Sequence, residues 1–109
     1  MGAYNTVTIL AKCKACGSTA SVTVQFKFGE TRQIDYVVGD RLRWGGNDIG
    51  RPGLSRVVVA GAGEDCTACG AEGGDYEVWI ERDVIVRVDP VDAPSRFLDA
   101  QETFVIIEA

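Results

Sequence analysis

The stretch Val22-Thr23-Val24-Gln25-Phe26-Lys27-Phe28 decides the fold class of this chain of 109 residues. Apolar residues stand at every second position of the stretch, and polar residues stand between them. Successive side chains of a β-strand point to opposite faces, so this pattern is typical of a strand with one buried and one exposed face. We therefore expect a mainly β protein with antiparallel strands arranged in hairpins.

The same alternation recurs later in the chain and predicts two hairpins. After the turn residue Gly29, alternating apolar residues at 34–38 predict a hairpin with residues 22–28, in which the glycine supplies a positive φ. Residues 77–81 and 84–88 alternate on either side of two charged residues, which predicts the second hairpin.

The rest of the chain holds fewer regular elements. At most one short helix is predicted, at 92–100, because this stretch follows Pro90 and precedes the last apolar run. The length suits one domain, and a hydrophobic content of 46% is ordinary for a globular protein, so we expect a single domain over residues 1–109. Three further strands are expected, at 7–11, 56–60 and 103–107.

Two matching pentapeptides, Cys13-Lys14-Ala15-Cys16-Gly17 and Cys66-Thr67-Ala68-Cys69-Gly70, contain all four cysteines of the chain. Each C-x-x-C turn supplies two soft ligands, and together they supply the four thiolates that tetrahedral zinc binds at about 2.3 Å. Two disulfides are the alternative, but the paired spacing favours reduced, metal-bound thiolates. The predicted ligands of a structural Zn²⁺ are Cys13, Cys16, Cys66 and Cys69.

These two turns, which we call knuckles, divide the predicted domain into parts. They occupy residues 13–17 and 66–70, and a β-rich insertion of residues 18–65 lies between them. This interval is longer than the spacing of a compact DNA-reading finger. The metal is therefore expected to join the start and the middle of a β-domain, and residues 71–109 are expected to form a hairpin and a tail.

The knuckles resemble those of the zinc-ribbon, or rubredoxin-like, class, in which two such turns hold one metal ion beside an antiparallel sheet. The opening Met1-Gly2-Ala3-Tyr4-Asn5-Thr6-Val7, followed by the first knuckle, also looks like that of small uncharacterised bacterial zinc-ribbon proteins. The resemblance implies a bacterial, cytoplasmic adaptor and carries over only the metal ligands. Iron in the same ligand set would make a rubredoxin-like electron carrier, but the longer interval and chain make iron the less favoured metal.

Catalysis is not expected of this chain. Four cysteine ligands would complete the coordination sphere and leave no position for water or substrate. The chain has no histidine, which removes the commonest general base and any Ser-His or Cys-His nucleophile pair. We therefore expect a non-enzymatic module that binds another macromolecule.

The charge of the chain favours a protein as the partner. The net charge is −5, with +4 in residues 1–60 and −9 in residues 61–109. An acidic surface repels phosphate backbones, so nucleic acid is disfavoured as a partner. The sequence shows no signal peptide and no run of about 18 apolar residues, so we expect a cytoplasmic protein with no membrane partner.

The irregular stretch 44–55 is the predicted contact surface. Glycine and proline interrupt it too often for a regular element, and loops of this length in compact domains are often functional. Trp and Arg are also the residue types most enriched in binding hot spots. The alternative is that the tryptophan packs over the β-core and the arginines are solvated. The predicted contact residues are Arg41, Arg43, Trp44, Arg51 and Arg56.

Two more specific functions remain open. With these arginines as a basic patch and Trp44 as a stacking platform, the chain would be a nucleic-acid-binding zinc ribbon. With an acidic hairpin steering it to a cationic active site, it would be an inhibitor or immunity partner of a basic toxin. The carboxylates of that hairpin are Asp75, Glu77, Glu81 and Asp83.

Overall fold

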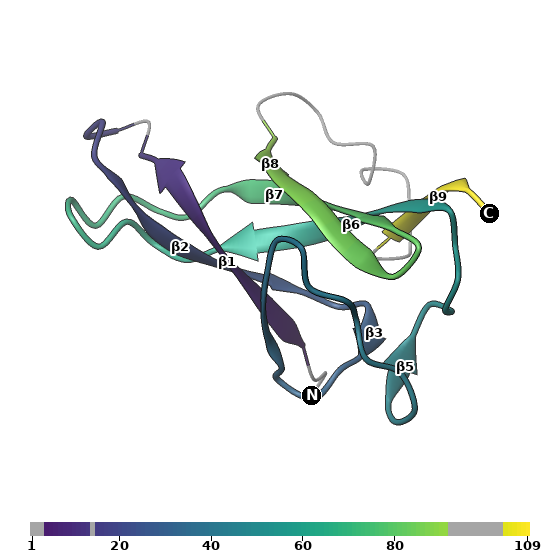
Figure 1. The fold of residues 1–109 in the computed structure, drawn as a ribbon. Coiled ribbons are helices and arrows are strands. Elements are labelled where there is room, and N and C mark those ends of the chain that lie inside the picture. Colours follow the sequence, from purple (N-terminus) through teal and green to yellow (C-terminus); the bar gives the residue numbers. More distant parts are fainter. Residues whose placement is uncertain (1–3, 14, 92–103) are drawn as a thin grey trace.

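The computed structural model of the chain describes residues 4–13, 15–91 and 104–109. These residues form nine strands and no helix, which confirms the prediction of a mainly β fold (Figure 1). The helix predicted at 92–100 lies outside the described residues. The strands are β1 (Asn5–Lys12), β2 (Thr19–Phe26), β3 (Gly29–Glu30), β4 (Asp35–Val37), β5 (Asp48–Ile49), β6 (Arg56–Gly63), β7 (Asp75–Glu81), β8 (Val84–Pro90) and β9 (Phe104–Glu108).

Seven strands form one curled sheet in the order β4-β1-β2-β6-β7-β8, and β9 pairs with β6 beside this path (Figure 1). Neighbouring strands are antiparallel except β4, which runs parallel to β1. β3 and β5 form a separate two-stranded sheet. The three single strands predicted from the sequence correspond to β1, β6 and β9, and the second predicted hairpin is formed by β7 and β8.

The first predicted hairpin is wrong. Its first half lies in β2, which pairs with β1 and β6, whereas its second half contains β4, which pairs with β1. The chain therefore does not fold back on β2 after Gly29, but crosses to the far edge of β1. Gly29 has a φ of 78°, as predicted for a turn residue, yet it also pairs with Ile49 across the small β3–β5 sheet.

The buried side chain of Asn5 explains this crossing. Its Nδ2 donates hydrogen bonds to the carbonyls of Phe28 and Glu30 at 3.0 and 3.1 Å. Its Oδ1 accepts hydrogen bonds from the N–H groups of Arg32 and Ile34 at 3.3 and 3.2 Å. One fully buried amide thus satisfies four backbone groups of the loop, and these bonds hold the loop open rather than in a tight turn.

After β4, the chain bonds to the first half of β8 and joins the two edges of the curled sheet. The N–H of Gly39 donates to the Ile85 carbonyl at 2.7 Å, and the N–H of Ile85 donates to the Asp40 carbonyl at 3.0 Å. Arg41 then forms an antiparallel bridge with Val84. We call this end of the sheet the closed end, and the opposite end, at residues 9–12 of β1 and 86–90 of β8, the open end.

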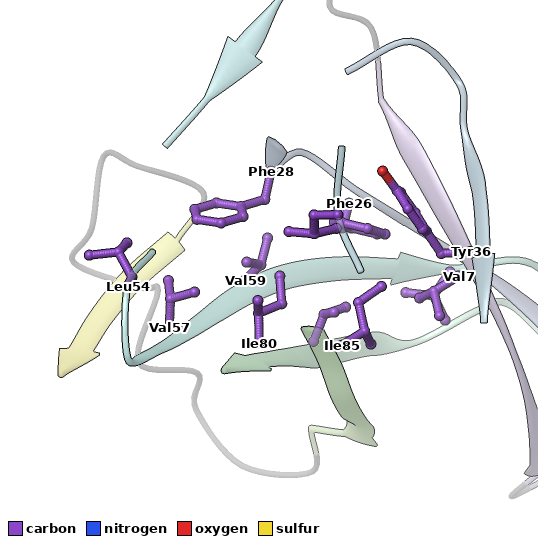
Figure 2. Packing of buried hydrophobic residues seen from close by; sticks show 12 residues of the cluster. Val7, Phe26, Phe28, Tyr36, Leu54, Val57, Val59, Ile80 and Ile85 are labelled. Atoms are coloured by element: carbon purple, nitrogen blue, oxygen red, sulfur yellow. The ribbon is translucent and has the colours of Figure 1, made fainter. Parts of the chain in front are cut away.

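The hydrophobic core fills the curl from its middle to the closed end (Figure 2). Phe28 is 1% exposed, and its ring meets those of Phe104 and Trp44 edge to face at centroid distances of 5.1 and 5.5 Å. Such aromatic pairs stabilise a fold beyond the area that they bury. The buried cluster contains Val7, Val24, Phe26, Phe28, Tyr36, Leu42, Leu54, Val57, Val59, Val78, Ile80 and Ile85.

Candidate metal centre

Two strand connections meet at the open end and carry the four cysteines. The first pair lies on the turn between β1 and β2, and the second pair lies between β6 and β7. They come together because β2 pairs with β6, so both connections leave the sheet on the same side (Figure 1). Two hydrogen bonds of 3.0 Å extend this pairing, from the Glu64 N–H to the Thr23 carbonyl and from the Thr23 N–H to Glu64 Oε1.

The two knuckles have the same backbone geometry. The N–H of Gly17 donates to the Cys13 carbonyl at 2.8 Å, and the N–H of Gly70 donates to the Cys66 carbonyl at 2.9 Å. In each knuckle the N–H of the first cysteine also donates to the carbonyl five residues on, at 2.9 Å in the first and 2.8 Å in the second. The two glycines have φ values of 76° and 75°, in the left-handed region that favours glycine.

The sulfur atoms of the four cysteines form a compact cluster in which all Sγ atoms lie within 4.8 Å of one another. The Sγ atoms of Cys13 and Cys69 are 3.8 Å apart, and so are those of Cys16 and Cys66. A tetrahedral ion with four bonds of about 2.3 Å requires sulfur–sulfur edges of about 3.8 Å. All four cysteines are free thiols. The donor set therefore fits one tetrahedral metal ion.

The contacts across the cluster follow an approximate twofold relation between the knuckles. Exchanging the knuckles places Cys13 on Cys66 and Cys16 on Cys69, so one of the two 3.8 Å pairs becomes the other. Matched turns thus present matched ligands, two from each connection. An ion at this position would join the start of β2 to the connection before β7.

Hydrogen bonds from the backbone favour the thiolate form that a metal ion binds. The N–H of Ser18, followed by its hydroxyl group, lowers the pKa of the Cys16 thiol to about 6. The N–H of Cys69 is the largest cause that lowers the pKa of Cys66. The N–H of Ala71 acts in the same direction on Cys69, but the neighbouring thiols, Cys66 first, and partial desolvation outweigh it and raise the pKa of Cys69 to about 12. Thiolates this close repel one another, so a cation is needed to keep all four charged.

A full set of four thiolates has structural rather than hydrolytic chemistry, because it leaves no coordination position open. Among the residues that the structure describes, this is the one group of three or more His, Cys, Asp or Glu side chains with ligand atoms this close. Cys16 and Cys69 are exposed, and the other two cysteines are partly buried. The site can fasten two connections together at the surface or, with iron, carry one electron.

Trp44, which was predicted as a contact residue, belongs to the edge of the core. Its side chain is partly buried, and its ring meets Phe28 edge to face. Its Nε1 is buried and has no hydrogen-bond partner. This packing agrees with the alternative that the tryptophan packs over the β-core. The stretch that it begins is also less irregular than predicted, because it contains β5.

The four predicted contact arginines are all exposed. Arg41 and Arg43 line one shallow hollow of about 210 Å³, which also contains Tyr36. Arg56 begins β6, and its Nε lies 3.2 Å from Glu81 Oε2. Arg51 lies on the loop between β5 and β6. Two of the four arginines thus line one hollow together with Asp35 and Asp40, and a third takes part in an ion pair.

The four carboxylates of the predicted acidic hairpin lie along β7 and its turn. Asp75, Glu77 and Glu81 stand at alternate positions of β7, on the face opposite to the core residues of this strand. Asp83 lies in the turn, where its Oδ1 accepts a hydrogen bond of 3.0 Å from the Gly53 N–H. Glu81, which pairs with Arg56, and Asp83 therefore have side-chain partners within the chain.

A second acidic group, which the sequence analysis missed, lies beside the metal centre. Glu64, Asp65 and Glu72 join Asp75 around a hollow at the open end. Asp65 Oδ1 accepts a hydrogen bond of 2.9 Å from the Gly73 N–H, which fixes the loop after the second knuckle. The sequence held a sign of this group, since two acidic residues directly precede the second knuckle.

The described residues form strands and no helix, and hence no helix that could span a membrane. Compared with models of protein families, with curated proteins and with solved structures, the chain gave no match.

Proposed function

We propose that this protein is a zinc-stabilised β-domain that binds another protein and catalyses no reaction. The observation that carries the proposal is the cluster of four Sγ atoms, in which two separations of 3.8 Å fit a tetrahedral ion. Structural zinc contributes an apparent binding free energy of about 10–16 kcal/mol, which stabilises a fold whose unfolded chain has no preformed site. At the open end, where apolar side chains are only partly buried, zinc binding would supply stabilisation that the core supplies elsewhere.

Zinc is the metal that we assign to the site. Soft thiolate ligands select zinc or iron among the common metals. The two matched knuckles beside an antiparallel sheet agree with the zinc-ribbon type of site that the sequence resembles. Cys13, Cys16, Cys66 and Cys69 would hold the ion, and zinc would supply structure without redox chemistry.

A binding role suits the remaining features better than catalysis or nucleic-acid recognition does. The closed ligand set and the lack of histidine in the chain leave no recognisable catalytic group. Trp44 packs edge to face on Phe28, which disfavours its use as a stacking platform for bases. The net charge of −5 also disfavours phosphate backbones. A protein partner therefore agrees best with these observations.

Metal analysis tests the zinc assignment. The chain is produced in medium that contains both zinc and iron, and its metal content and visible absorption are measured after purification. We expect one zinc per chain and a colourless sample. A coloured sample with one iron per chain, bleached by a reductant, would instead make the protein an electron carrier.

Cross-linking in a lysate of the source organism tests the class of partner. The zinc-loaded chain is cross-linked with and without prior nuclease treatment. We expect a protein partner whose recovery is the same after nuclease treatment. Recovery that nuclease abolishes, together with a gel shift that weakens steeply with salt, would instead support nucleic-acid binding.

A further inference from the structure

The open end of the sheet contains a hollow of about 450 Å³ beside the metal centre. Its walls come from β1, β2, β7, β8 and the β6–β7 connection, and they include the apolar side chains of Ile9, Val22, Tyr76 and Val88. These side chains pack against the core but are only partly buried. A volume of this size lies within the range of pockets that bind ligands. The described part of the chain thus leaves an apolar concave surface uncovered.

Burial falls along the strands toward the open end. On β1, Val7 is 0% exposed, whereas Ile9, two residues further on and on the same face, is only partly buried. On β2, Val24 is 0% exposed, whereas Val22 is only partly buried. In the sheet, Val7 lies directly opposite Val24, and Ile9 lies directly opposite Val22. Since the residue types are alike, the difference lies in what covers them.

The strand edge beside this hollow has backbone groups that no described strand pairs with. The Thr6 N–H donates to the Ile34 carbonyl at 3.0 Å and so points away from β2. The backbone groups of successive residues in a strand alternate in direction, so those of every second residue of β1 from Thr6 onward point away from β2 as well. β4 covers this edge only from Thr6 to Thr8. The backbone groups of Leu10 and Lys12 therefore face an edge that no described strand occupies. An edge of this kind is a template for an added strand.

The rim of the hollow is acidic. Among the described lining residues, four carboxylates from the β6–β7 connection and the start of β7 stand against one cation, Lys12. All four carboxylates are exposed, and two of them are held in place by backbone hydrogen bonds. Such a rim attracts a cationic partner and repels an anionic one. The four are Glu64, Asp65, Glu72 and Asp75.

We propose that the open end binds a short extended segment of a partner protein in which lysine or arginine alternates with apolar residues. The segment adds a strand along residues 9–12 of β1 and places its apolar side chains in the hollow, while the field of the four rim carboxylates attracts its cations. This inference rests on the proposed protein-binding function and names the surface and the chemistry of the partner. It places the contact at the open end rather than on the arginine-bearing stretch.

A designed peptide tests the proposal. The probe is a labelled octapeptide in which valine alternates with lysine or arginine, and its binding to the zinc-loaded chain is followed by fluorescence anisotropy at two salt concentrations. We expect saturable binding that weakens with salt, and no binding of a matched peptide with glutamate in place of the cations. Equal binding of both peptides, or no binding of the cationic one, would overturn the proposal.

Two variants locate the contact. The double variant Glu72→Gln/Asp75→Asn removes two rim charges, and we expect it to weaken peptide binding about fivefold, since exposed charge pairs each contribute little. The control Glu81→Gln/Glu108→Gln removes two charges on the closed-end side of β7 and on β9, and we expect it to leave binding unchanged. An equal loss in both variants would show a non-specific charge effect and overturn the proposal.

A third variant fills the hollow itself. Ala20 lines the hollow and is partly buried, so we expect Ala20→Phe to reduce peptide binding at least tenfold while zinc content and the far-ultraviolet spectrum stay unchanged. Unchanged peptide binding by a zinc-loaded Ala20→Phe variant would contradict the proposal. A concentration-dependent dimer that these same variants dissociate would also overturn it, because the occupant would then be a second copy of the chain.

This inference rests on the proposed function, and measurement of zinc content shows which of the two has failed. A chain without zinc would contradict the proposed function, whatever the peptide does. A zinc-loaded, folded chain that binds neither peptide would leave the zinc-stabilised domain intact and overturn only the assignment of the open end.

Discussion

At the closed end of the curled sheet, the ring of Phe28 packs against those of Trp44 and Phe104, whereas at the open end Ile9 and Val22 are only partly buried and four thiols join the strand connections. The first end is stabilised by removing apolar surface from water. The second is stabilised by ligands that converge on one position. One small sheet is therefore stabilised by two kinds of interaction, and we expect that each can be removed separately.

Removal of one thiol ligand should produce the largest effect. Cys16→Ser replaces a soft ligand by a hard one, and we expect it to remove most of the metal-binding free energy of about 10–16 kcal/mol. Metal affinity by competition with a chelator and chemical unfolding measure the change. Thr67→Ser, within the second knuckle but not a ligand, should keep both values near those of the parent chain. A Cys16→Ser variant that binds zinc as tightly as the parent would show that Cys16 is not a ligand of the metal.

Removal of the central aromatic side chain tests the closed end. Phe28 is 1% exposed, and we expect Phe28→Ala to lower the free energy of unfolding by about 3–5 kcal/mol. Because the side chain lies away from the thiols, the variant should still bind one zinc per chain while it remains folded. Val37→Ala, at a side chain that is 53% exposed, is the control and should cost about 0.5 kcal/mol or less. Loss of zinc from a folded Phe28→Ala variant would show that the two ends are not separate.

Two glycines near the closed end test how tightly the core is packed there. Gly50 and Gly53 both have a φ of +81°, but a Cβ on Gly50 would lie 2.2 Å from the Phe28 ring, whereas a Cβ on Gly53 would have no atom within 4 Å. Gly53→Ala should cost about 1–2 kcal/mol from its backbone conformation alone. Gly50→Ala should cost about 1–3 kcal/mol more, because the core must also move. Equal costs in thermal unfolding would mean that the ring is not packed against Gly50.

The smallest effect is expected at the surface ion pair between β6 and β7. The side chains of Arg56 and Glu81 are 46% and 42% exposed, and their N–O distance is 3.2 Å. Glu81→Gln should change the free energy of unfolding by less than about 1 kcal/mol, and high salt should remove the difference. A larger, salt-independent loss would show that this edge of the sheet contributes more than its exposure indicates.

The sequence predicted the features that depend on local patterns. Alternation located most of the strands, and the spacing of the cysteines predicted the ligands that the structure brings together. The first hairpin was mispredicted because the path after Phe28 depends on hydrogen bonds to Asn5, a residue far away in sequence. Alternation of apolar and polar residues predicts which face of the sheet a side chain occupies, but it does not predict which strand lies beside it.

The hollow at the open end could not be predicted for a related reason. Ile9 and Val22 have the same alternation as their buried neighbours, so the sequence gives no sign that they are less covered. Their exposure depends on which distant segments cover them, and β4 leaves β1 after Thr8, before Ile9. Trp44 was ambiguous from composition alone, because its residue type suits both a contact surface and the edge of a core.

X-ray absorption at the zinc edge of the purified chain measures directly which atoms surround the ion. If the four cysteines hold one ion between the knuckles, the spectrum should show four sulfur neighbours at about 2.3 Å and no lighter ligand. The Cys16→Ser variant, where it keeps any zinc, should lose one sulfur neighbour. A chain without zinc, or a zinc site with oxygen or nitrogen among its ligands, would contradict the account.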